Sequence, residues 1–317
     1  MNYLLLDGNS IGRAANSSKT KLFSGEQETQ AIYGFLRTLH KFAKTFKHHK
    51  PIVLWDGNAQ WRKDIFPDYK ANRKNLSSAQ ESDKKSYDSQ KNLIYEAIKY
   101  LGVESLIDYS AEADDIAGFL SKRLTGKIVL ITGDRDWQQL VNENVVWIDH
   151  RTDKMCNSKN FKEITGFDDP MQFLEAKCLS GDTSDNIPGV GGFGGKAIKE
   201  FFENFGTVEE FISCAKNGEH IILKSGKLLP SLFTALANNE TPKSSKKYGT
   251  LPPMIEGYQR NLKLMKLGDD YLPKILKSKD NFFDREKFKE FCENLLFNSI
   301  IDQLDDWQST FGEKQWL

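Results

Sequence analysis

The chain has few cysteines, no excess of either charge and no long hydrophobic run. Four cysteines are scattered over 317 residues without a CxxC pair, which argues against a disulfide framework and against a zinc site. Lysine plus arginine equals aspartate plus glutamate at 44 each, so only a local separation of charge would point to nucleic acid. No apolar run reaches membrane-spanning length, and the amino terminus lacks a basic region and a cleavage site. We therefore expect a cytoplasmic protein that binds no membrane.

The composition is that of a soluble globular protein, with 39% hydrophobic and 28% charged residues, long enough for two domains. Three apolar runs, at 3–6, 51–55 and 128–131, lack alternation, as do parallel strands that are covered on both faces. Helical patterns separate them, which predicts an α/β fold with a mainly parallel central sheet and helices on both faces. Each run is followed by an acid: Asp7, Asp56 and Asp134.

More acids lie around a helical pattern that precedes the third strand. The motif EADD at 112–115 stands before apolar residues whose spacing predicts a helix over 113–124 with one buried face. Acids at a helix start often only cap it and complement its dipole, and we expect Asp136 to cap a short helix at 137–141. Open α/β sheets, however, place ligands at the carboxyl ends of their strands. The combined pattern therefore favours one carboxylate group: Asp7, Asp56, Glu112, Asp114, Asp115, Asp134 and Asp136.

Crowded carboxylates repel one another and raise each other's pKa values. A fold that keeps so many of them needs cations between them. Oxygen ligands without histidine or cysteine suit Mg²⁺, with Mn²⁺ as a substitute. Two such ions about 4 Å apart activate a water and stabilise the leaving oxygen of a phosphodiester. The sequence thus predicts a two-metal phosphodiesterase site.

A basic and aromatic segment spans 61–74. Cations track a phosphate backbone and aromatic rings stack on unpaired bases, so this segment predicts contact with a nucleic acid. Residues 75–88 are polar, and we expect a solvated, mobile loop there, with a buried helix resuming at 93–101. The residues of the segment are Trp61, Arg62, Lys63, Phe66, Tyr69, Lys70, Arg73 and Lys74.

A glycine-rich stretch follows a predicted helix at 171–179. Asp182 and Asp185 stand beside it, and a helix is expected at 196–205. The stretch matches GxGxxG formally, but no strand precedes it and no βαβ unit encloses it, and a Walker A motif fails because alanine follows Lys196. A glycine hairpin that leads into a helix still presents backbone N–H groups to a phosphate.

The remaining chain carries weaker signals. We expect a strand and an irregular stretch at 145–165, helices over 207–237, an exposed basic connector at 238–253 and packing helices over 254–304. For the aromatic residues of the tail, core packing is favoured over a partner-binding peptide. These residues are Trp307, Phe311 and Trp316.

Taken together, the motifs resemble the 5′-nuclease family of flap endonucleases and 5′–3′ exonucleases, and most of all its stand-alone bacteriophage members of the phage ribonuclease H type. They occur in family order over residues 1 to about 205, and 206–317 resemble the family only loosely. The motifs are LLLDGN at 4–9, WDG at 55–57, FPDYKANR at 66–73, EADD at 112–115, TGDRDWQQL at 132–140 and LSGDTSDNIPGVGGFGGK at 179–196.

The resemblance implies roles for individual residues. Asp7, Asp56, Glu112, Asp114 and Asp134 would bind one metal, with Asp115 in the same motif, and Asp136, Asp182 and Asp185 a second, looser one. An arch at about 61–92 would pass a single-stranded 5′ end, with Tyr69 stacking on a base and Lys70 and Arg73 holding the scissile phosphate. A helix-3-turn-helix element at about 180–205 would grip duplex DNA around K⁺. Expected DNA contacts are Arg62, Lys63, Lys74, Gly189, Gly192, Gly194, Lys196 and Lys199.

The resemblance also implies a 5′-nuclease domain at 1–170 and a helical domain at 171–317. It implies a monomer that cleaves 5′ ends and 5′ flaps of DNA, and RNA primers in RNA–DNA hybrids, in the cytoplasm of a phage-infected cell, with single-stranded DNA-binding protein as a partner. The chain departs from the family at Ala197, where threonine or arginine is common, and in lacking a clear sliding-clamp peptide.

Two other functions remain open from the residues alone. A PIN-like ribonuclease would use a similar acidic sheet edge on unstructured RNA and would need no glycine hairpin. A non-catalytic protein that binds branched DNA would use its acids only as helix caps. Cleavage of labelled substrates with and without Mg²⁺ separates the three functions.

Overall fold

The computed structural model describes residues 1–317 except 75, 220, 269–272, 275, 278–281 and 313–317. The chain divides into two compact units. The first unit comprises Met1–Ala59, Leu76–Ser158 and Leu267–Leu317, and the second comprises Gln60–Asn75 and Lys159–Lys266. The division expected near residue 170 therefore differs from the compact units, because the last part of the chain returns to the first unit.

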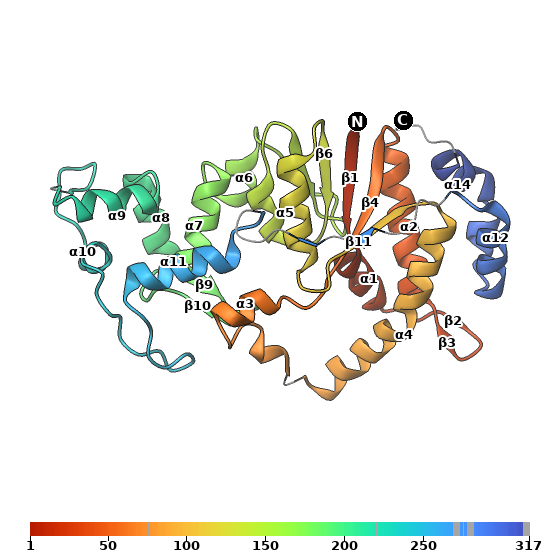
Figure 1. The fold of residues 1–317 in the computed structure, drawn as a ribbon, viewed down its shortest axis with the longest axis horizontal. Coiled ribbons are helices and arrows are strands. Elements are labelled where there is room, and N and C mark those ends of the chain that lie inside the picture. The colour runs from red at the N-terminus through yellow and green to blue at the C-terminus, as the bar shows by residue number, and fades with distance from the viewer. Residues whose placement is uncertain (75, 220, 269–272, 275, 278–281, 313–317) are drawn as a thin grey trace. The chain divides into compact units, whose positions relative to one another are not determined.

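The first unit is built on a seven-stranded sheet (Figure 1). Its five inner strands are parallel, and both edge strands, β11 and β8, pair antiparallel, which confirms the predicted mainly parallel sheet. In spatial order the strands are β11 (Leu276–Lys277), β5 (Glu104–Ile107), β4 (His49–Trp55), β1 (Asn2–Asp7), β6 (Ile128–Ile131), β7 (Val145–Ile148) and β8 (Met155–Cys156).

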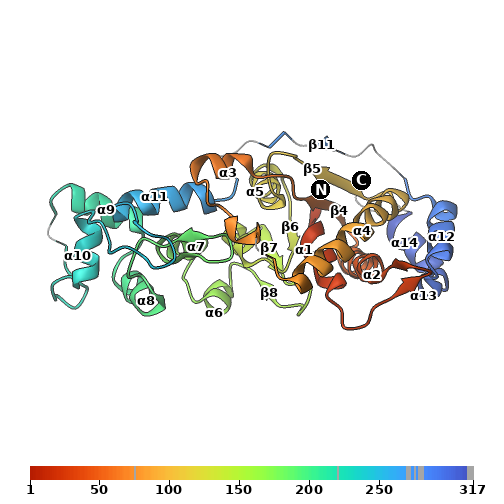
Figure 2. The same ribbon diagram turned by 90° about the horizontal axis from the view of Figure 1, so that it is seen from below.

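Helices cover both faces of this sheet, with α1 and α2 on one side and α5 on the other (Figure 2). Alternate strand residues such as Leu4 and Leu6 join the core cluster beneath α2 and α4, whereas Leu5 faces the opposite side, since side chains alternate along a strand. Because both faces are covered, the strands are apolar without alternation. The helices of this unit are α1 (Gly8–Asn16), α2 (Gln30–Thr45), α4 (Ser78–Tyr100), α5 (Ala113–Arg123), α12 (Arg285–Asn294), α13 (Asn298–Ile301) and α14 (Leu304–Phe311), with the 3₁₀ helix η2 (Arg135–Leu140) and the hairpin strands β2 (Phe23–Ser24) and β3 (Gln27–Glu28).

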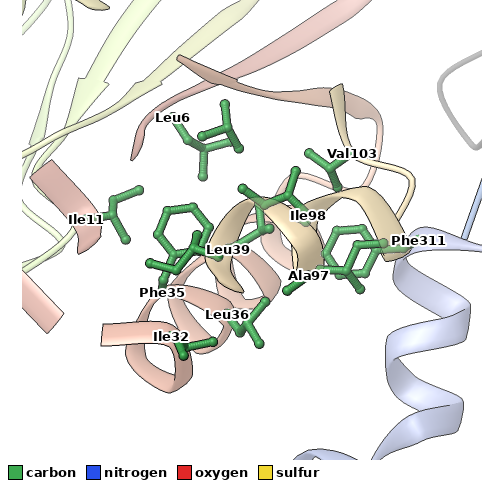
Figure 3. Close-up of a cluster of buried hydrophobic side chains, with 14 of the residues drawn as sticks. Leu6, Ile11, Ile32, Phe35, Leu36, Leu39, Ala97, Ile98, Val103 and Phe311 are labelled. Carbon is green, nitrogen blue, oxygen red and sulfur yellow. The ribbon is translucent and has the colours of Figure 1, made fainter. Parts of the chain in front are cut away.

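The core cluster joins distant parts of the chain (Figure 3). Phe35, Leu36 and Leu39 of α2 lie against Ala97 and Ile98 of α4. Two tail aromatics belong to the same cluster, since Trp307 is 0% and Phe311 4% exposed, which confirms the expected core packing for both. Trp316 lies outside the described residues. The tail therefore helps to build the body of the first unit.

Helix α4 corrects the expectation of a mobile loop at 75–88. It begins at Ser78, because Ser77 and Gln80 form a reciprocal capping box. Beyond its first turns, Gln90 is fully buried, accepting from Ala31 N at 2.8 Å and donating to Asn16 Oδ1 at 3.0 Å. Polar partners contributed by other segments therefore order this helix, and an analysis of apolar periodicity does not detect them.

The second unit is mostly helical. The predicted helices at 171–179 and 196–205 are confirmed within one residue at each end, whereas the stretch expected to be helical at 207–237 is divided by an isolated bridge between Ile222 and Leu228. Its elements are α3 (Gln60–Ile65), the 3₁₀ helix η1 (Ala71–Lys74), α6 (Phe161–Thr165), α7 (Pro170–Ser180), β9 (Gly181–Asp182), β10 (Ile187–Pro188), α8 (Gly195–Asn204), α9 (Val208–Lys216), α10 (Ser231–Ala237) and α11 (Met254–Met265). None of the helices among the described residues has the length and hydropathy needed to cross a membrane.

Candidate active site

Three strand-end carboxylates lie close together at one edge of the sheet in the first unit. β1 runs parallel between β4 and β6, and its register pairs Asp7 with Leu54, so Asp56 follows two residues beyond that level. The pKa of Asp7 is raised to about 7, first by burial, next by the negative charge of Asp56 and more weakly by that of Asp134. The three acids are thus electrostatic neighbours, as the sequence predicts.

A buried hydroxyl links two of these acids. Thr132 is fully buried, and its Oγ1 donates to Asp7 Oδ2 at 2.7 Å while accepting from the backbone N of Asp134 at 3.0 Å. On the other side, the backbone N of Ser10 donates to Asp7 Oδ1 at 2.9 Å. Sequence analysis missed Thr132 as a positioning residue, although a threonine directly after a buried strand was a visible signal.

The start of α5 holds further acids of the group. The backbone N of Ala113 donates to Asp56 Oδ1 at 2.9 Å, which connects the end of β4 to this helix. The indole Nε1 of Trp137 donates to Asp114 Oδ1 at 2.6 Å. Glu112 is buried at the N-cap position of the helix. The backbone and the tryptophan thus each hold one oxygen of a carboxylate in this group.

Three acids of the group also serve as caps, and Asp7 caps α1 through its bond from Ser10 N. Asp115 is buried, and its Oδ2 accepts from the backbone N of Glu112 at 3.0 Å. Asp134 accepts from the backbone N of Asp136 at 2.8 Å and thereby caps η2. The prediction that Asp136 is the cap was wrong, because the helical turn begins at Arg135, two residues before the expected start at 137. Each of these caps uses one named carboxylate oxygen. Capping and metal binding are therefore compatible, and the metal-binding role of these acids stays a prediction.

Two cations of the first unit were missed by the sequence analysis. Lys91 of α4 lies over the rings of Trp55 and Tyr95, with Nζ 5.4 and 5.6 Å from their centroids. Burial lowers the pKa of Lys91, and the charge of Asp56 opposes that shift. Arg13 of α1 lies over the ring of Tyr87 at 5.4 Å. Lys91 lies in the polar stretch that was predicted to belong to the arch, so the sequence did not indicate a position beside Trp55 and Tyr95.

In the second unit, Asp182 is surrounded by donors. Burial alone would raise the pKa of Asp182, but the positive charge of Lys177 and the hydrogen bonds from Ser184 lower it to about 2. Lys177 Nζ lies 3.1 Å from Oδ2, and the hydroxyl and backbone N of Ser184 donate to Oδ1 at 2.6 and 2.8 Å. This carboxylate is therefore ionised and partly compensated within its own unit.

Asp185 contacts three residues of the predicted arch. Arg73 donates to its Oδ1 at 2.7 Å, the Tyr69 hydroxyl donates to its Oδ2 at 3.1 Å, and Lys70 Nζ lies 3.6 Å away. The ring of Tyr69 is 4% exposed and lies beside the cations of Lys70 and Arg62. Because the Tyr69 side chain is buried in this conformation, the predicted stacking on a base would require the ring to move.

The other predicted DNA contacts of the arch differ in exposure. Arg62 is 2% exposed, donates from Nε to the backbone O of Leu264 at 2.9 Å and lies over the Trp61 ring at 4.4 Å, so it has a packing role within the second unit. Lys63 is half-buried in α3. Lys74 ends η1, and its side chain lies outside the described part of the chain.

The glycine hairpin has the predicted form. Gly192 adopts a φ of +76°, and an added Cβ at Gly189 would lie 2.5 Å from the backbone O of Ser180, so only glycine fits there. Gly194 is the N-cap of α8, whose exposed residues include Lys196 and Lys199. The open helix start with adjacent lysines is suited to a phosphate.

The oxygen atoms of the predicted metal ligands are of the chemical type that binds a hard divalent cation. They are carboxylate oxygens. Burial and neighbouring negative charges raise the pKa of Asp7, and a bound cation would favour its ionised form. As the side chains lie, the described residues contain no group of three or more histidine, cysteine, aspartate or glutamate side chains arranged to hold a metal ion. The metal ligands therefore stay a prediction.

Comparisons with known proteins match the part of the chain that contains the sheet-edge acids. The family model for the N-terminal resolvase-like domain of 5′-3′ exonucleases matches residues 2–166. The chain is 28% identical to a 5′-3′ exonuclease of Buchnera aphidicola over 66% of this chain and 71% of that protein. It is 30% identical to the flap endonuclease Xni of Shewanella woodyi over 64% of this chain and 77% of that protein.

The fold is shared with solved structures. A bacteriophage T5 D15 flap endonuclease complex with DNA and metal ions is 21% identical, with a TM-score of 0.64 and coverage of 99% of this chain and 100% of that one. The expected fold is thereby confirmed. The match of the family model over more than half of the sequence places this chain in the 5′-nuclease family of 5′–3′ exonucleases and flap endonucleases.

Proposed function

We propose that this chain hydrolyses phosphodiesters at 5′ ends and 5′ flaps of DNA with two Mg²⁺ ions, for which Mn²⁺ can substitute. The single observation that carries the proposal is the gathering of carboxylates at one edge of the first unit's sheet, where Asp7 ends β1 and shares the Thr132 hydroxyl with the Asp134 backbone. Burial and the charges of Asp56 and Asp134 raise the pKa of this Asp7. A fold keeps such a destabilised carboxylate where function uses it. The sheet-edge acids lie within the part of the chain that the nuclease family model matches.

The acids of the first unit hold the first cation in this proposal. Bound Mg²⁺ supplies an activated water and stabilises charge on the leaving 3′ oxygen. Thr132 and the backbone N of Ser10 orient the two oxygens of Asp7, and Ala113 N and Trp137 orient Asp56 and Asp114. Hydrogen bonds of this kind fix the direction of a ligand and improve its affinity. The proposed ligands are Asp7, Asp56, Glu112, Asp114 and Asp134, with Asp115 beside them.

A second, looser cation has its own set of acids in this proposal. These acids are Asp136, Asp182 and Asp185. Lys70 and Arg73 bind the scissile phosphate, where two positive charges stabilise the charge that develops in the transition state.

The hairpin of the second unit binds the duplex beside the cleaved strand. Backbone N–H groups at Gly189, Gly192 and Gly194 and the side chains of Lys196 and Lys199 contact phosphates, with K⁺ held by backbone carbonyls. Arg62, Lys63 and Lys74 are the proposed contacts of the arch. We further propose that RNA primers in RNA–DNA hybrids are substrates, that the enzyme acts as a monomer in the cytoplasm of the phage-infected cell, and that single-stranded DNA-binding protein is a partner.

One experiment tests the activity and its rivals. End-labelled 5′-flap DNA, RNA–DNA hybrid and single-stranded RNA are incubated with the protein in EDTA, Mg²⁺, Mn²⁺ or Ca²⁺, and the products are mapped. We expect cleavage at the 5′ flap and of the hybrid with Mg²⁺ or Mn²⁺, and none in EDTA. Cleavage of unstructured RNA in preference to flap DNA would support the ribonuclease instead. Flap binding that EDTA leaves unchanged, without any product, would support the non-catalytic protein.

A further inference from the structure

Within the second unit, the base of the predicted arch is docked on an acidic turn. We use the name arch base for residues 68–73 and docking turn for residues 182–186. The Asp185 carboxylate accepts from Arg73 at 2.7 Å and from the Tyr69 hydroxyl at 3.1 Å, with Lys70 Nζ at 3.6 Å. The side chains of Asp185 and Lys70 are 19% and 17% exposed. One poorly exposed acid thus holds the two cations that are proposed to bind the scissile phosphate.

Backbone groups make the same contact in both directions. Lys70 N donates to Asp185 O at 2.9 Å, and the Asn186 side chain donates to Asp68 O at 2.9 Å. The Asn72 amide donates to the backbone O atoms of Thr183 and Ser184 at 3.1 and 3.2 Å. Hydrogen bonds thus run from the arch base to the docking turn and back, which fixes the register between them.

The backbone on each side of this contact is unusual. Lys70 has a φ of +55° and Asn186 a φ of +60°. Asparagine tolerates the left-handed region, but lysine rarely adopts it. Such conformations persist where the surroundings hold them in place, and they concentrate at functional sites. In this conformation the backbone N–H of Lys70 donates to the backbone O of Asp185, and the side-chain Nζ of Lys70 lies near the Asp185 carboxylate.

We infer that Asn72 and Asp185 are positioning residues that dock the arch base and orient Lys70 and Arg73. The catalytic consequence rests on the proposed nuclease function, whereas the dock itself does not. A loop closure without function would need only the backbone contacts. The docking turn adds a carboxylate that gathers a lysine, an arginine and a tyrosine hydroxyl, and none of these is required to close a loop.

Hydrogen exchange measured by mass spectrometry on the metal-free protein in EDTA tests the dock directly. The variants are Asn72→Ala and Asp185→Asn, and the matched control is Asp64→Asn, which removes an exposed acid from α3 in the same unit. We expect exchange of peptides covering 68–73 and 182–186 to speed up about tenfold in both variants, as local opening becomes easier, and to stay within about twofold in the control. Unchanged exchange in Asn72→Ala and Asp185→Asn would overturn the proposal.

Since Asn72 is exposed, its variant is expected to fold, which keeps the test decisive if Asp185→Asn does not. On 5′-flap DNA, Asn72→Ala is expected to lower kcat about tenfold with KM changed less than twofold. Lys70 and Arg73 would still bind the phosphate but would no longer be held in the productive orientation. A raised KM with unchanged kcat would contradict positioning. Absence of cleavage by the unaltered protein would reject the proposed function and leave the exchange result to decide the dock.

Discussion

Two groups of acids in this chain differ in how their charge is compensated. At the sheet edge of the first unit, burial and the charges of Asp56 and Asp134 raise the pKa of Asp7 to about 7. In the docking turn of the second unit, Lys177 and Ser184 overcome burial and lower the pKa of Asp182 to about 2. In the first group the acids raise one another's pKa, whereas the second group has lysine and arginine partners within its own unit.

The difference suggests a division of labour under the proposed mechanism. Acids whose negative charges raise a neighbour's pKa gain most from a divalent ion, so the sheet edge should be the tighter site. Acids that already hold cations gain less, so the docking turn should be the looser site and should also serve to place Lys70 and Arg73. Measurements of cleavage, stability and metal binding would test this contrast between the two groups.

The largest expected effect is on cleavage. Asp134→Asn keeps the size of the side chain and removes a charge from the sheet edge, so we expect kcat on 5′-flap DNA to fall by about 10³-fold or more. Asp182→Asn should also slow cleavage by orders of magnitude, but excess Mn²⁺ should recover more of the activity in Asp182→Asn than in Asp134→Asn. Steady-state rates at several metal concentrations measure both. Near wild-type cleavage by Asp134→Asn would remove the sheet edge from the active site.

Next in size is the pH dependence of stability, which should have opposite signs in the two groups. Asp7 has a raised pKa, so the folded protein favours its protonated form, and this contribution falls as the pH rises from 3.8 through about 7. Asp182 has a lowered pKa, so its contribution is present above 3.8 and is lost as the pH falls through about 2.

Urea unfolding of the metal-free protein between pH 4 and pH 8 checks these signs. We expect Asp7→Asn to be more stable than the unaltered protein at pH 8 and to lose less stability as the pH rises, whereas Asp182→Asn should be less stable across this range. If Asp7→Asn were destabilised at pH 8 by as much as at pH 4, Asp7 would not carry an uncompensated charge.

Much of the sheet-edge group could be predicted from sequence, because its signals are local. Apolar runs without alternation give the strands, and an acid after each run falls at the same edge once the strands are parallel. The helix at 78–92 could not be predicted in this way. Its buried side chains include Gln90, whose partners Asn16 and Ala31 come from other segments. Polar burial leaves no hydrophobic period to detect.

The contacts of the docking turn and the division into units could not be predicted from local sequence patterns either. Asp185 has the same residue type as the sheet-edge acids, and only the fold shows that Lys70 and Arg73 reach it across more than a hundred residues of chain. Likewise, α12–α14 return to the first unit through Phe288 and Trp307, and helical periodicity says which face is buried but not against which partner. Such long-range pairing is decided by tertiary packing.

A smaller effect is expected on thermal stability. Because a ligand that binds only the folded state stabilises it by RT ln(1 + [L]/Kd), Mg²⁺ at about 100 times its Kd should stabilise the protein by about 2.7 kcal/mol. We expect Tm at pH 7.5 to rise with Mg²⁺, less so in Asp7→Asn, and nearly as much as wild type in Asp182→Asn. Calorimetry with and without EDTA measures this. An equal rise in all three proteins would place the stabilising ion away from the sheet edge.

The smallest effect concerns the hydroxyl that links the two sheet-edge acids. Thr132→Val keeps the shape of a fully buried side chain but removes its donor to Asp7 and its acceptor for the Asp134 backbone N–H. Loss of these bonds should destabilise the protein by about 1–3 kcal/mol and slow cleavage roughly tenfold, since the carboxylates lose their fixed direction. Thr132→Ser keeps the hydroxyl and is the matched control, with most of the cleavage rate retained. If Thr132→Val destabilised the fold and left kcat unchanged, the bridge would serve stability alone, and the contrast between the two acidic groups would rest on their charges without any contribution from orientation.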